Sequence, residues 1–317
     1  MKNPILPVNS IMENKGSAEK EISALIVNYN AKEYVLRTLE SVHRNMSGLD
    51  YEIIVADNAS DDGSVESIKE RYPEVRLIAF NYNAGYAKAN NYLAKHASGR
   101  YLLFLNNDTF ILKGSVEKLI EIKKRDLEYG IVAPLILNPD GSYQQSFGKD
   151  LNIFSELFLK LFAENWYCLY LKLKKEKMNR NVDWVSGACF LIERSLYEKV
   201  KGFDENFFLY VEDADLGRRI RQLGYKIHFS SESRIIHSRG ISVSKYPQHI
   251  LPIAKRSQLF YYSKHNSRLA LGVLRIYLFL RFKLKLLIFY LKGDSKGCEV
   301  CREVIQVIRE FSCEHYS

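Results

Sequence analysis

Cysteine is scarce in this sequence, and the few cysteines form no obvious framework. Five occur in 317 residues, at Cys168, Cys189, Cys298, Cys301 and Cys313. An odd number of scattered cysteines excludes a secreted disulfide scaffold and is typical of a reducing cytoplasm. Cys298, Cys301, Cys313 and His315 match no common zinc spacing. We therefore expect buried apolar packing at these cysteines, with a zinc site as the weaker alternative.

Long apolar runs and glycine-rich phosphate loops are also missing. Residues 1–20 contain no continuous apolar core and no clear cleavage site, so we expect a flexible leader without a signal peptide. The apolar stretch from Leu269 to Leu280 is interrupted by Arg275, which excludes a membrane-spanning helix of about 20 apolar residues. Neither GxGxxG nor GxxxxGK[ST] follows the first expected strand, which disfavours dinucleotide binding and P-loop chemistry.

Positive charge is present in excess, but it is unevenly distributed. The net charge is +9 and the pI about 9.1. From residue 251 onward, twelve Lys and Arg residues face five Asp and Glu residues, so the first 250 residues are nearly neutral. A nucleic-acid-binding protein would carry basic residues around its folded core, so we expect no nucleic-acid partner.

Apolar strands alternate with amphipathic helices from Glu21 onward. We expect strands at 22–28, 51–56, 75–80 and 101–106, and helices at 64–72, 86–96 and 115–125, with a further helix carrying Val35, Leu39, Val42 and Met46 on one face. This alternation predicts an α/β fold with a doubly wound, mostly parallel sheet flanked by helices. We place a catalytic domain at 21–250, with halves at about 21–135 and 136–250, and a basic, amphipathic helical extension at 251–317.

Polar residues follow each of the four expected strands. They are the stretches NYN (28–30), DNASDDGS (57–64), NYNAG (81–85) and NNDT (106–109). Each is by itself an ordinary turn or helix cap. Because ligands of parallel sheets bind beyond the carboxyl ends of the strands, four such ends in succession indicate a binding site.

The stretch from Gly202 to Tyr225 contains a conflict between polarity and burial. A helix beginning near Val211 has an apolar stripe, and at 100° per residue Glu212 and Asp213 lie beside that stripe. Asp215 and Arg218 should point well away from it. Acids in a first turn complement the helix dipole, but that effect does not explain their position beside the buried face.

Together these motifs resemble glycosyltransferase family 2, the inverting sugar transferases of the GT-A fold. The resemblance rests on LIVNYN, VADNASDDGS, NAGYAKANN, FLNNDT, VSGACFLIER and GFDENFFLYVEDADLGRRIRQLGY, in that order, over residues 22–244. The nearest branch is the bacterial rhamnosyltransferase-like one, which builds surface polysaccharides. It implies transfer of a sugar from a dTDP- or UDP-sugar donor to a glycan or lipid-linked acceptor, with L-rhamnose carried by dTDP as one candidate.

The resemblance also implies roles for individual residues. Asp57 would bind the nucleobase, within a nucleotide-sugar site made of Val27, Asn28, Tyr29, Asn30, Asp57, Asn83, Asn106, Asn107 and Asp108. Asp108 and His237 would hold Mg²⁺ or Mn²⁺. Asn106 departs from the family's DxD motif, since it replaces the first acid by an amide.

The acidic pair would carry the chemistry. By resemblance, Asp213 is the general base beside Glu212, while Trp184, Gly187 and Ala188 line the acceptor side. The direction of the pKa shift of Asp213 is open at this stage, because neighbouring aromatic residues would raise it and a helix N-terminus would lower it.

The basic segment 251–293 suits contact with an anionic membrane surface, because basic residues alternate there with Leu, Phe and Tyr. A second amphipathic stretch begins near Trp166. Packing of these helices on the catalytic core is the alternative. We expect a cytoplasmic protein, peripheral to the inner face of the membrane; self-association is compatible with the sequence.

Two other functions stay open on the residues alone. A catalytically degenerate family member would bind a glycan or a partner protein without turnover, and Asn106 is the one feature that favours it. A sugar-1-phosphate nucleotidylyltransferase would need a glycine-rich, arginine-bearing loop after the first strand, which NYNAKEY lacks.

Overall fold

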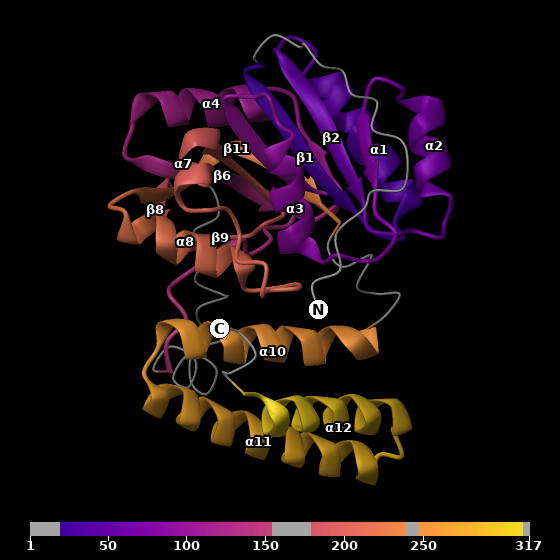
Figure 1. Cartoon of the computed structure of the whole chain (residues 1–317), viewed down its shortest axis with the longest axis vertical. Helices are drawn as coiled ribbons and strands as arrows, with labels where there is room; N and C mark the ends of the chain where they lie inside the picture. Colours follow the sequence, from indigo (N-terminus) through magenta and orange to yellow (C-terminus); the bar gives the residue numbers. More distant parts are fainter. Residues whose placement is uncertain (1–19, 154–178, 239–246, 313–317) are drawn as a thin grey trace.

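The computed structural model describes residues 20–153, 179–238 and 247–312 (Figure 1). The strands are β1 (Ile22–Asn28), β2 (Tyr51–Asp57), β3 (Arg76–Ala79), β4 (Tyr101–Asn106), β5 (Thr109–Ile111), β6 (Tyr129–Leu137), β7 (Phe147–Gly148), β8 (Arg180–Val182), β9 (Trp184–Val185), β10 (Cys189–Glu193) and β11 (Lys226–His237). The helices are α1 (Lys32–Asn45), α2 (Ser64–Arg71), α3 (Tyr86–Lys95), α4 (Ser115–Arg125), α7 (Arg194–Lys199), α8 (Glu212–Gln222), α10 (Pro247–His265), α11 (Arg268–Leu291) and α12 (Ser295–Glu310). The expected leader and the stretch near Trp166 lie outside the described residues.

The main sheet is mixed, with a parallel half that matches the sequence prediction. Its strand order is β3-β2-β1-β4-β10-β6-β11-β5, and β8 pairs with β11. The strands β3, β2, β1 and β4 run parallel, whereas β10 enters antiparallel between β4 and β6. The expected α/β class and mostly parallel sheet are confirmed, and the antiparallel strands β5, β8 and β10 are what the alternating pattern did not predict.

The sheet is buried on both faces, which explains the near-continuous apolar runs of its strands. Along β1, Leu25 packs into one core with side chains of α3, α7 and α8, whereas Ala24 and Ile26 pack into a second core with α1, α2 and α4. This alternation follows from the period of two in a strand. The result is a three-layer domain, and the loops at the carboxyl ends of its strands can form a binding site.

The strand register brings the polar strand ends together. Asn28 of β1 pairs with Asp57 of β2, and Val27 pairs with Asn106 of β4. On the far side of the sheet, Thr109 of β5 pairs with His237 of β11. Residues separated by more than a hundred positions along the chain thus share one rim.

The helices α10, α11 and α12 form a separate layer beside α8 and β9 (Figure 1). They enclose a third core, which Phe207 and Ala214, from α8 and the loop before it, also enter. The expected helical extension is therefore present from Pro247, four residues before the anticipated boundary at 251. Within the described residues, no helix combines the length and apolarity needed to cross a membrane.

Gly99 offers a test of how tightly the chain is packed against the beginning of β1. A Cβ atom at this position would lie 2.4 Å from the amide nitrogen of Ser23, a backbone atom that cannot rotate away. We expect Gly99→Ala to lower the free energy of unfolding by about 1–3 kcal/mol through overpacking. Gly48→Ala is the matched control, because nothing lies within 4 Å of its added Cβ. Equal urea midpoints for the two variants would contradict this packing.

Candidate active site

Asp57 ends β2 with its carboxylate almost wholly buried and held by two loops. Its Oδ2 atom accepts hydrogen bonds from Asn28 Nδ2 at 2.8 Å and from Ser60 Oγ at 2.7 Å. Its Oδ1 atom accepts one from the Ser60 amide at 2.8 Å. A carboxylate has about four acceptor positions, so the chain fixes the orientation of this group and leaves one position for a ligand.

The neighbouring asparagines direct their side chains into the protein. Asn107 Nδ2 donates to Asn28 Oδ1 at 2.9 Å, and Asn30 Oδ1 accepts from the amide of Asp61 at 2.9 Å. Asn28, Asn30 and Asn107 therefore support Asp57 and the first two loops with these contacts. The other residues predicted for this side, Val27, Tyr29, Asn83 and Asn106, lie at the carboxyl ends of β1, β3 and β4 or in the loops that follow them.

Asp108 and His237 form a buried pair at the opposite end of the rim. His237 Nε2 lies 3.0 Å from Asp108 Oδ1, and Asn106 Nδ2 lies 3.4 Å from the same ring nitrogen. The β5–β11 pairing brings this about, because it sets Thr109 opposite His237. The sequence placed these two residues in one site, and the structure brings them into contact.

Gln144 determines which nitrogen of His237 carries a proton. Gln144 Nε2 donates to Asn138 Oδ1 at 2.7 Å and to the His237 carbonyl at 3.1 Å, so its Oε1 atom must face the ring. That oxygen lies 2.6 Å from His237 Nδ1 and can only accept a hydrogen bond. Nδ1 is therefore protonated, which leaves Nε2 as the atom that faces Asp108.

This arrangement fits a divalent cation. A carboxylate oxygen and an imidazole nitrogen that face each other need a positive charge between them, either a proton or a metal ion. The hydrogen bond from His237 Nδ1–H to an amide oxygen is the usual support of a metal-binding histidine. Nowhere in the described ranges, this site included, are three or more His, Cys, Asp or Glu residues grouped to hold a metal, so the pair would need further oxygen ligands from a substrate or water.

Asp213 lies in the first turn of α8, facing the segment that precedes β10. Its Oδ2 atom accepts from the amide of Gly187 at 3.2 Å, and its Oδ1 atom accepts from the amide of Ala214 at 2.7 Å. Burial raises the pKa of Asp213 to about 6, although both hydrogen bonds act to lower it. The question left open by the sequence is answered: desolvation outweighs the helix N-terminus, so the group is a stronger base than an ordinary aspartate.

The other two acids of this turn differ sharply from Asp213. Burial, then the charges of Asp213 and Asp215, raise the pKa of Glu212 well above its usual range, which favours the neutral form of this carboxyl group. Burial also acts to raise the pKa of Asp215, but the hydrogen bond from His265 and the charges of Arg219 and Lys264 outweigh it and hold that pKa at about 2. Asp215 does not share the apolar stripe of α8 that packs on the sheet, but it is nevertheless fully buried, because Lys264 and His265 of α10 cover it.

The chain enters α8 through two residues in the left-handed region. Tyr210 has φ 69° and Val211 has φ 71°, which is unfavourable for a β-branched side chain. Just before them, the Phe208 carbonyl accepts from the amide of Tyr86 at 2.8 Å and lies so close to Gly85 that a Cβ there would be 2.5 Å away. The loop before α8 is thus pressed against the start of α3, and the cost of such strain is about 1–3 kcal/mol per residue.

The segment from Ser186 to Ala188 connects the two ends of the site. The Gly187 amide donates to Asp213, while the Gly187 carbonyl accepts from Tyr86 Oη at 2.8 Å. One residue later, the Ala188 carbonyl accepts from the Asn106 amide at 3.0 Å and from Thr109 Oγ1 at 3.0 Å. The predicted acceptor residues Gly187 and Ala188 therefore link the loop of Asp108 to the carboxylate of Asp213.

Trp184 occupies a supporting position beside this segment. Its Nε1 atom donates to the Lys149 carbonyl at 2.8 Å, and its ring covers Gly148 so closely that a Cβ there would lie 2.4 Å from it. The same side chain packs partly against the third core. This environment favours structural packing for most of the indole.

Cys298 and Cys301 lie away from the rim, on the buried face of α12, as free thiols. This agrees with the apolar packing expected for them. Cys313 and His315, the other members of the alternative zinc site, lie outside the described residues.

Three supporting residues carried no signal in the sequence that we could interpret. Gln144 looks like an ordinary loop residue, and Lys264 and His265 lie in the basic extension. Their partners are separated from them by dozens of residues, and only the folded structure brings each pair together. Ser60 differs from these three, because its partner Asp57 is three residues away in a recognisable Asp-x-x-Ser turn.

The charge states of α8 predict a large effect for one substitution and a small effect for a similar one. Near neutral pH, Asp215→Asn should lower the free energy of unfolding by about 3–5 kcal/mol, since it removes the buried carboxylate that binds Arg219, Lys264 and His265. Glu212→Gln should change it by less than about 1 kcal/mol, since Glu212 is already neutral. A depressed pKa stabilises the fold above the unfolded value near 3.9, so the Asp215→Asn deficit should vanish as the pH falls toward about 2. Chemical unfolding measured across this pH range gives the stability deficit of Asp215→Asn. A deficit that does not change with pH would contradict the assigned negative charge of Asp215.

Sequence comparison points to a single family. The profile described as "Glycosyl transferase family 2" matches residues 23–201. Among relatives, the N-acetylglucosaminyl-diphospho-decaprenol L-rhamnosyltransferase of Mycobacterium tuberculosis is 29% identical over 231 residues, which are 68% of this chain and 75% of that protein. Rhamnosyltransferase WbbL of Escherichia coli is 27% identical over 228 residues, or 67% of this chain and 81% of that protein.

Solved structures confirm the fold. The mannosyltransferase PcManGT from Pyrobaculum calidifontis, in complex with GDP-Man and Mn²⁺, superposes with a TM-score of 0.54 at 14% identity, covering 98% of this chain and 92% of that one. GalNAc-T7 with UDP, GalNAc and Mn²⁺ also gives a TM-score of 0.54, at 19% identity, covering 79% of this chain and 50% of that one. The fold is GT-A, and the family profile covers more than half of the sequence: this chain belongs to glycosyltransferase family 2 and is a glycosyltransferase.

Proposed function

We propose that this enzyme transfers L-rhamnose, with inversion and with the help of a divalent cation, from a dTDP-sugar to a lipid-linked glycan. The observation that carries the proposal is the segment 186–188, which joins the Asp213 carboxylate to the loop of Asp108. It sets a base and a diphosphate-binding loop on two sides of one rim. The choice of rhamnose is supported by the names of the relatives in Mycobacterium tuberculosis and Escherichia coli.

Asp213 acts as the general base in this proposal. A pKa of about 6 keeps it ionised near neutral pH while making it a better proton acceptor than an ordinary aspartate. It takes the proton of the acceptor hydroxyl as the oxygen attacks the anomeric carbon from the face opposite the diphosphate, and a single displacement inverts the configuration. Protonated Glu212 donates a hydrogen bond to the acceptor, because no described residue hydrogen-bonds its Oε2 atom.

The donor lies along β1, β2 and β4. Asp57 accepts from the nucleobase ring N–H through its remaining acceptor position. Such a charge-assisted hydrogen bond contributes roughly 1.5–3 kcal/mol. Asp108 and His237 hold Mg²⁺ or Mn²⁺, which when bound neutralises charge on the leaving diphosphate. The Mn²⁺ in the structures of PcManGT and GalNAc-T7 supports a divalent ion here.

A catalytically degenerate protein is the competing function, since Asn106 supplies no charge. The geometry favours an enzyme, because Asp57, Asp213 and the Asp108–His237 pair are each oriented by neighbours that bind no ligand themselves.

Release of nucleoside diphosphate from a panel of UDP-, dTDP- and GDP-sugars, with a lipid-linked acceptor, tests the reaction. We expect turnover of one donor that requires Mg²⁺ or Mn²⁺ and is abolished by EDTA. Asp213→Asn should reduce kcat by at least about a hundredfold while leaving donor affinity within about twofold, because the base does not contact the nucleotide. The rate of the wild-type enzyme should fall as the pH drops below about 6, where Asp213 becomes protonated.

Two results would contradict this function. Donor binding without turnover across the panel and its acceptors would indicate the degenerate protein. Unchanged metal dependence in Asp108→Ala would exclude Asp108 from the metal site. Asp126→Ala is a matched control, since Asp126 lies in the loop after α4, away from the rim.

We further propose that α11 lies on the inner face of the cytoplasmic membrane. Leu271, Leu274, Leu278 and Phe282 face the third core. A second apolar stripe lies roughly opposite at 100° per residue and is between 37% and 78% exposed. Its residues are Leu269, Val273, Ile276, Leu280, Leu284, Leu287 and Leu291. A helix with two apolar sides needs a second apolar environment for the outer one.

Charge indicates that this environment is an anionic lipid surface. The helix carries five basic residues, Arg268, Arg275, Arg281, Lys283 and Lys285, and no acidic residue. A second copy of α11 would oppose like charges, whereas anionic headgroups would attract them, at about 1 kcal/mol per basic residue near the surface. This contact would bring the active site within reach of a lipid-linked acceptor.

Substitution of the outer stripe tests the contact better than truncation, which would cut into the buried part of α10. The triple variant Ile276→Gln, Leu280→Gln, Leu284→Gln should bind phosphatidylglycerol-containing vesicles at least about tenfold more weakly, given about 1.5 kcal/mol or more for each apolar side chain buried. Leu127→Gln, an exposed leucine in the loop after α4, is the control. Unchanged sedimentation with vesicles, or a change of oligomeric state instead, would overturn the membrane assignment.

A further inference from the structure

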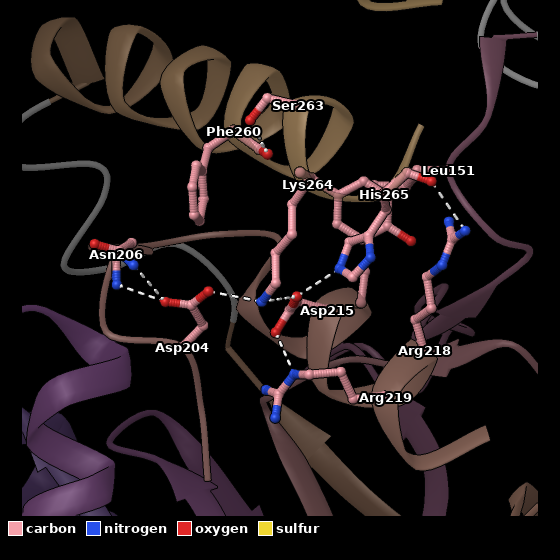
Figure 2. Close-up of polar contacts among 12 residues, drawn as sticks. Leu151, Asp204, Asn206, Asp215, Arg218, Arg219, Phe260, Ser263, Lys264 and His265 are labelled. Carbon is pink, nitrogen blue, oxygen red and sulfur yellow. Dashed lines mark hydrogen bonds and ion pairs between the residues drawn. The ribbon is translucent and has the colours of Figure 1, made fainter. Parts of the chain in front are cut away.

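Asp215 lies where a charged carboxylate loses all of its hydration, although the proposed reaction gives it no role in binding substrate. It is fully buried, and its two oxygens are shared among three nitrogen-bearing side chains (Figure 2). Arg219 Nε donates to Oδ2 at 2.7 Å, while Lys264 Nζ at 2.7 Å and His265 Nε2 at 2.6 Å contact Oδ1. Because a carboxylate of depressed pKa only accepts hydrogen bonds, the His265 nitrogen is the donor.

These partners come from different parts of the chain. Arg219 lies one turn further along α8, whereas Lys264 and His265 lie at the end of α10, about fifty residues away. Lys264 also donates to Asp204 Oδ2 at 2.6 Å, in the loop that leads into α8 (Figure 2). One lysine of the C-terminal helices therefore binds carboxylates on both sides of the Glu212–Asp213 pair.

Further contacts from α10 surround the same turn. Ser257 Oγ donates to the Leu209 carbonyl at 2.8 Å, and Arg218 Nη2 donates to the His265 carbonyl at 3.0 Å. Phe207 stacks edge-on against Phe260, and Ala214 lies in the same core. Contacts with α10 thus occur just before and just after Asp213, which itself faces the opposite way, toward Gly187.

The first turn of α8 needs such external support. It is entered through the unfavourable backbone of Tyr210 and Val211, and it contains three carboxyl groups within four residues. A purely apolar contact would stabilise the helix at lower desolvation cost than a buried ion pair. Ion pairs with fixed donors, however, define the direction and register of the helical turn. The catalytic rate depends strongly on both, because a displacement of about 1 Å can lower it a hundredfold.

We propose that Lys264 and His265 are positioning residues for Asp213, acting through Asp215 and Asp204. The C-terminal helices are then part of the catalytic apparatus and not only a surface for the membrane. The effect on turnover rests on the proposed transfer reaction, whereas the effect on the order of the α8 turn does not.

The test compares three variants of the full-length chain. Lys264→Met removes the ammonium group, Lys264→Arg restores a cation, and Lys255→Met removes a lysine from the same helix that donates to Gln258, three residues along. Amide hydrogen exchange of the peptide 209–217, kcat and donor dissociation constant are measured for each. Exchange reports local opening directly.

We expect Lys264→Met to speed exchange in 209–217 and to lower kcat at least about tenfold, with donor affinity within about twofold. Lys264→Arg should recover most of both losses, and Lys255→Met should match the wild type. If no donor is turned over by the wild type, the proposed function fails while faster exchange in Lys264→Met still supports the positioning role.

Unchanged exchange in 209–217 with unchanged kcat would overturn the inference, even if the melting temperature falls. A parallel loss of donor affinity and kcat would also overturn it, because a general loosening of the fold produces that result. If Lys264→Met cannot be recovered folded, His265→Phe poses the same question, since it removes one hydrogen bond to Asp215 and retains the ring contact with Tyr261.

Discussion

The structure depends on how one helical turn accommodates three carboxyl groups, two of them buried and one partly buried. Three ionised acids within four residues would repel one another and would each lose hydration. The chain resolves this by giving each a different state: Glu212 is neutral, Asp215 is ionised and paired with cations, and Asp213 titrates in between. The intermediate group is the one that faces the rim, so the pairing of Asp215 and the protonation of Glu212 leave a single adjustable base.

The rest of the site follows from this turn and from the sheet. Strand pairing sets Asp57 and Asp108 at carboxyl ends of parallel strands, and the backbone of Gly187 and Ala188 connects that edge to α8. Side chains that contact no ligand in our proposal, such as Asn28 and Gln144, orient those that do. Much of the polarity at the rim is therefore support for a few reactive atoms.

The sequence predicted the parallel half of the sheet, and the candidate residues Asp57 and Asp108 lie at or just after the carboxyl ends of its strands. Apolar runs locate β1 and β4, and the 3.6-residue period locates α4, at their observed ends. The antiparallel strand β10 could not be predicted in the same way, because an apolar strand looks alike in either direction. The burial of Asp215 was not predicted for a related reason: a helical wheel with one buried stripe assumes a single partner surface, whereas α8 packs against the sheet on one side and against α10 on another.

The position of β6 has a consequence for synthesis of the chain. Both hydrogen-bonded neighbours of this apolar strand, β10 and β11, are encoded after it. As the polypeptide leaves the ribosome, β1 to β4 can already assemble, while β6 waits with open backbone donors and acceptors on both sides. Such an exposed strand is an aggregation hazard and slows folding through non-local pairing. Premature termination anywhere between β6 and β10 would thus yield an insoluble product, and chaperone demand in the cell should peak over that interval.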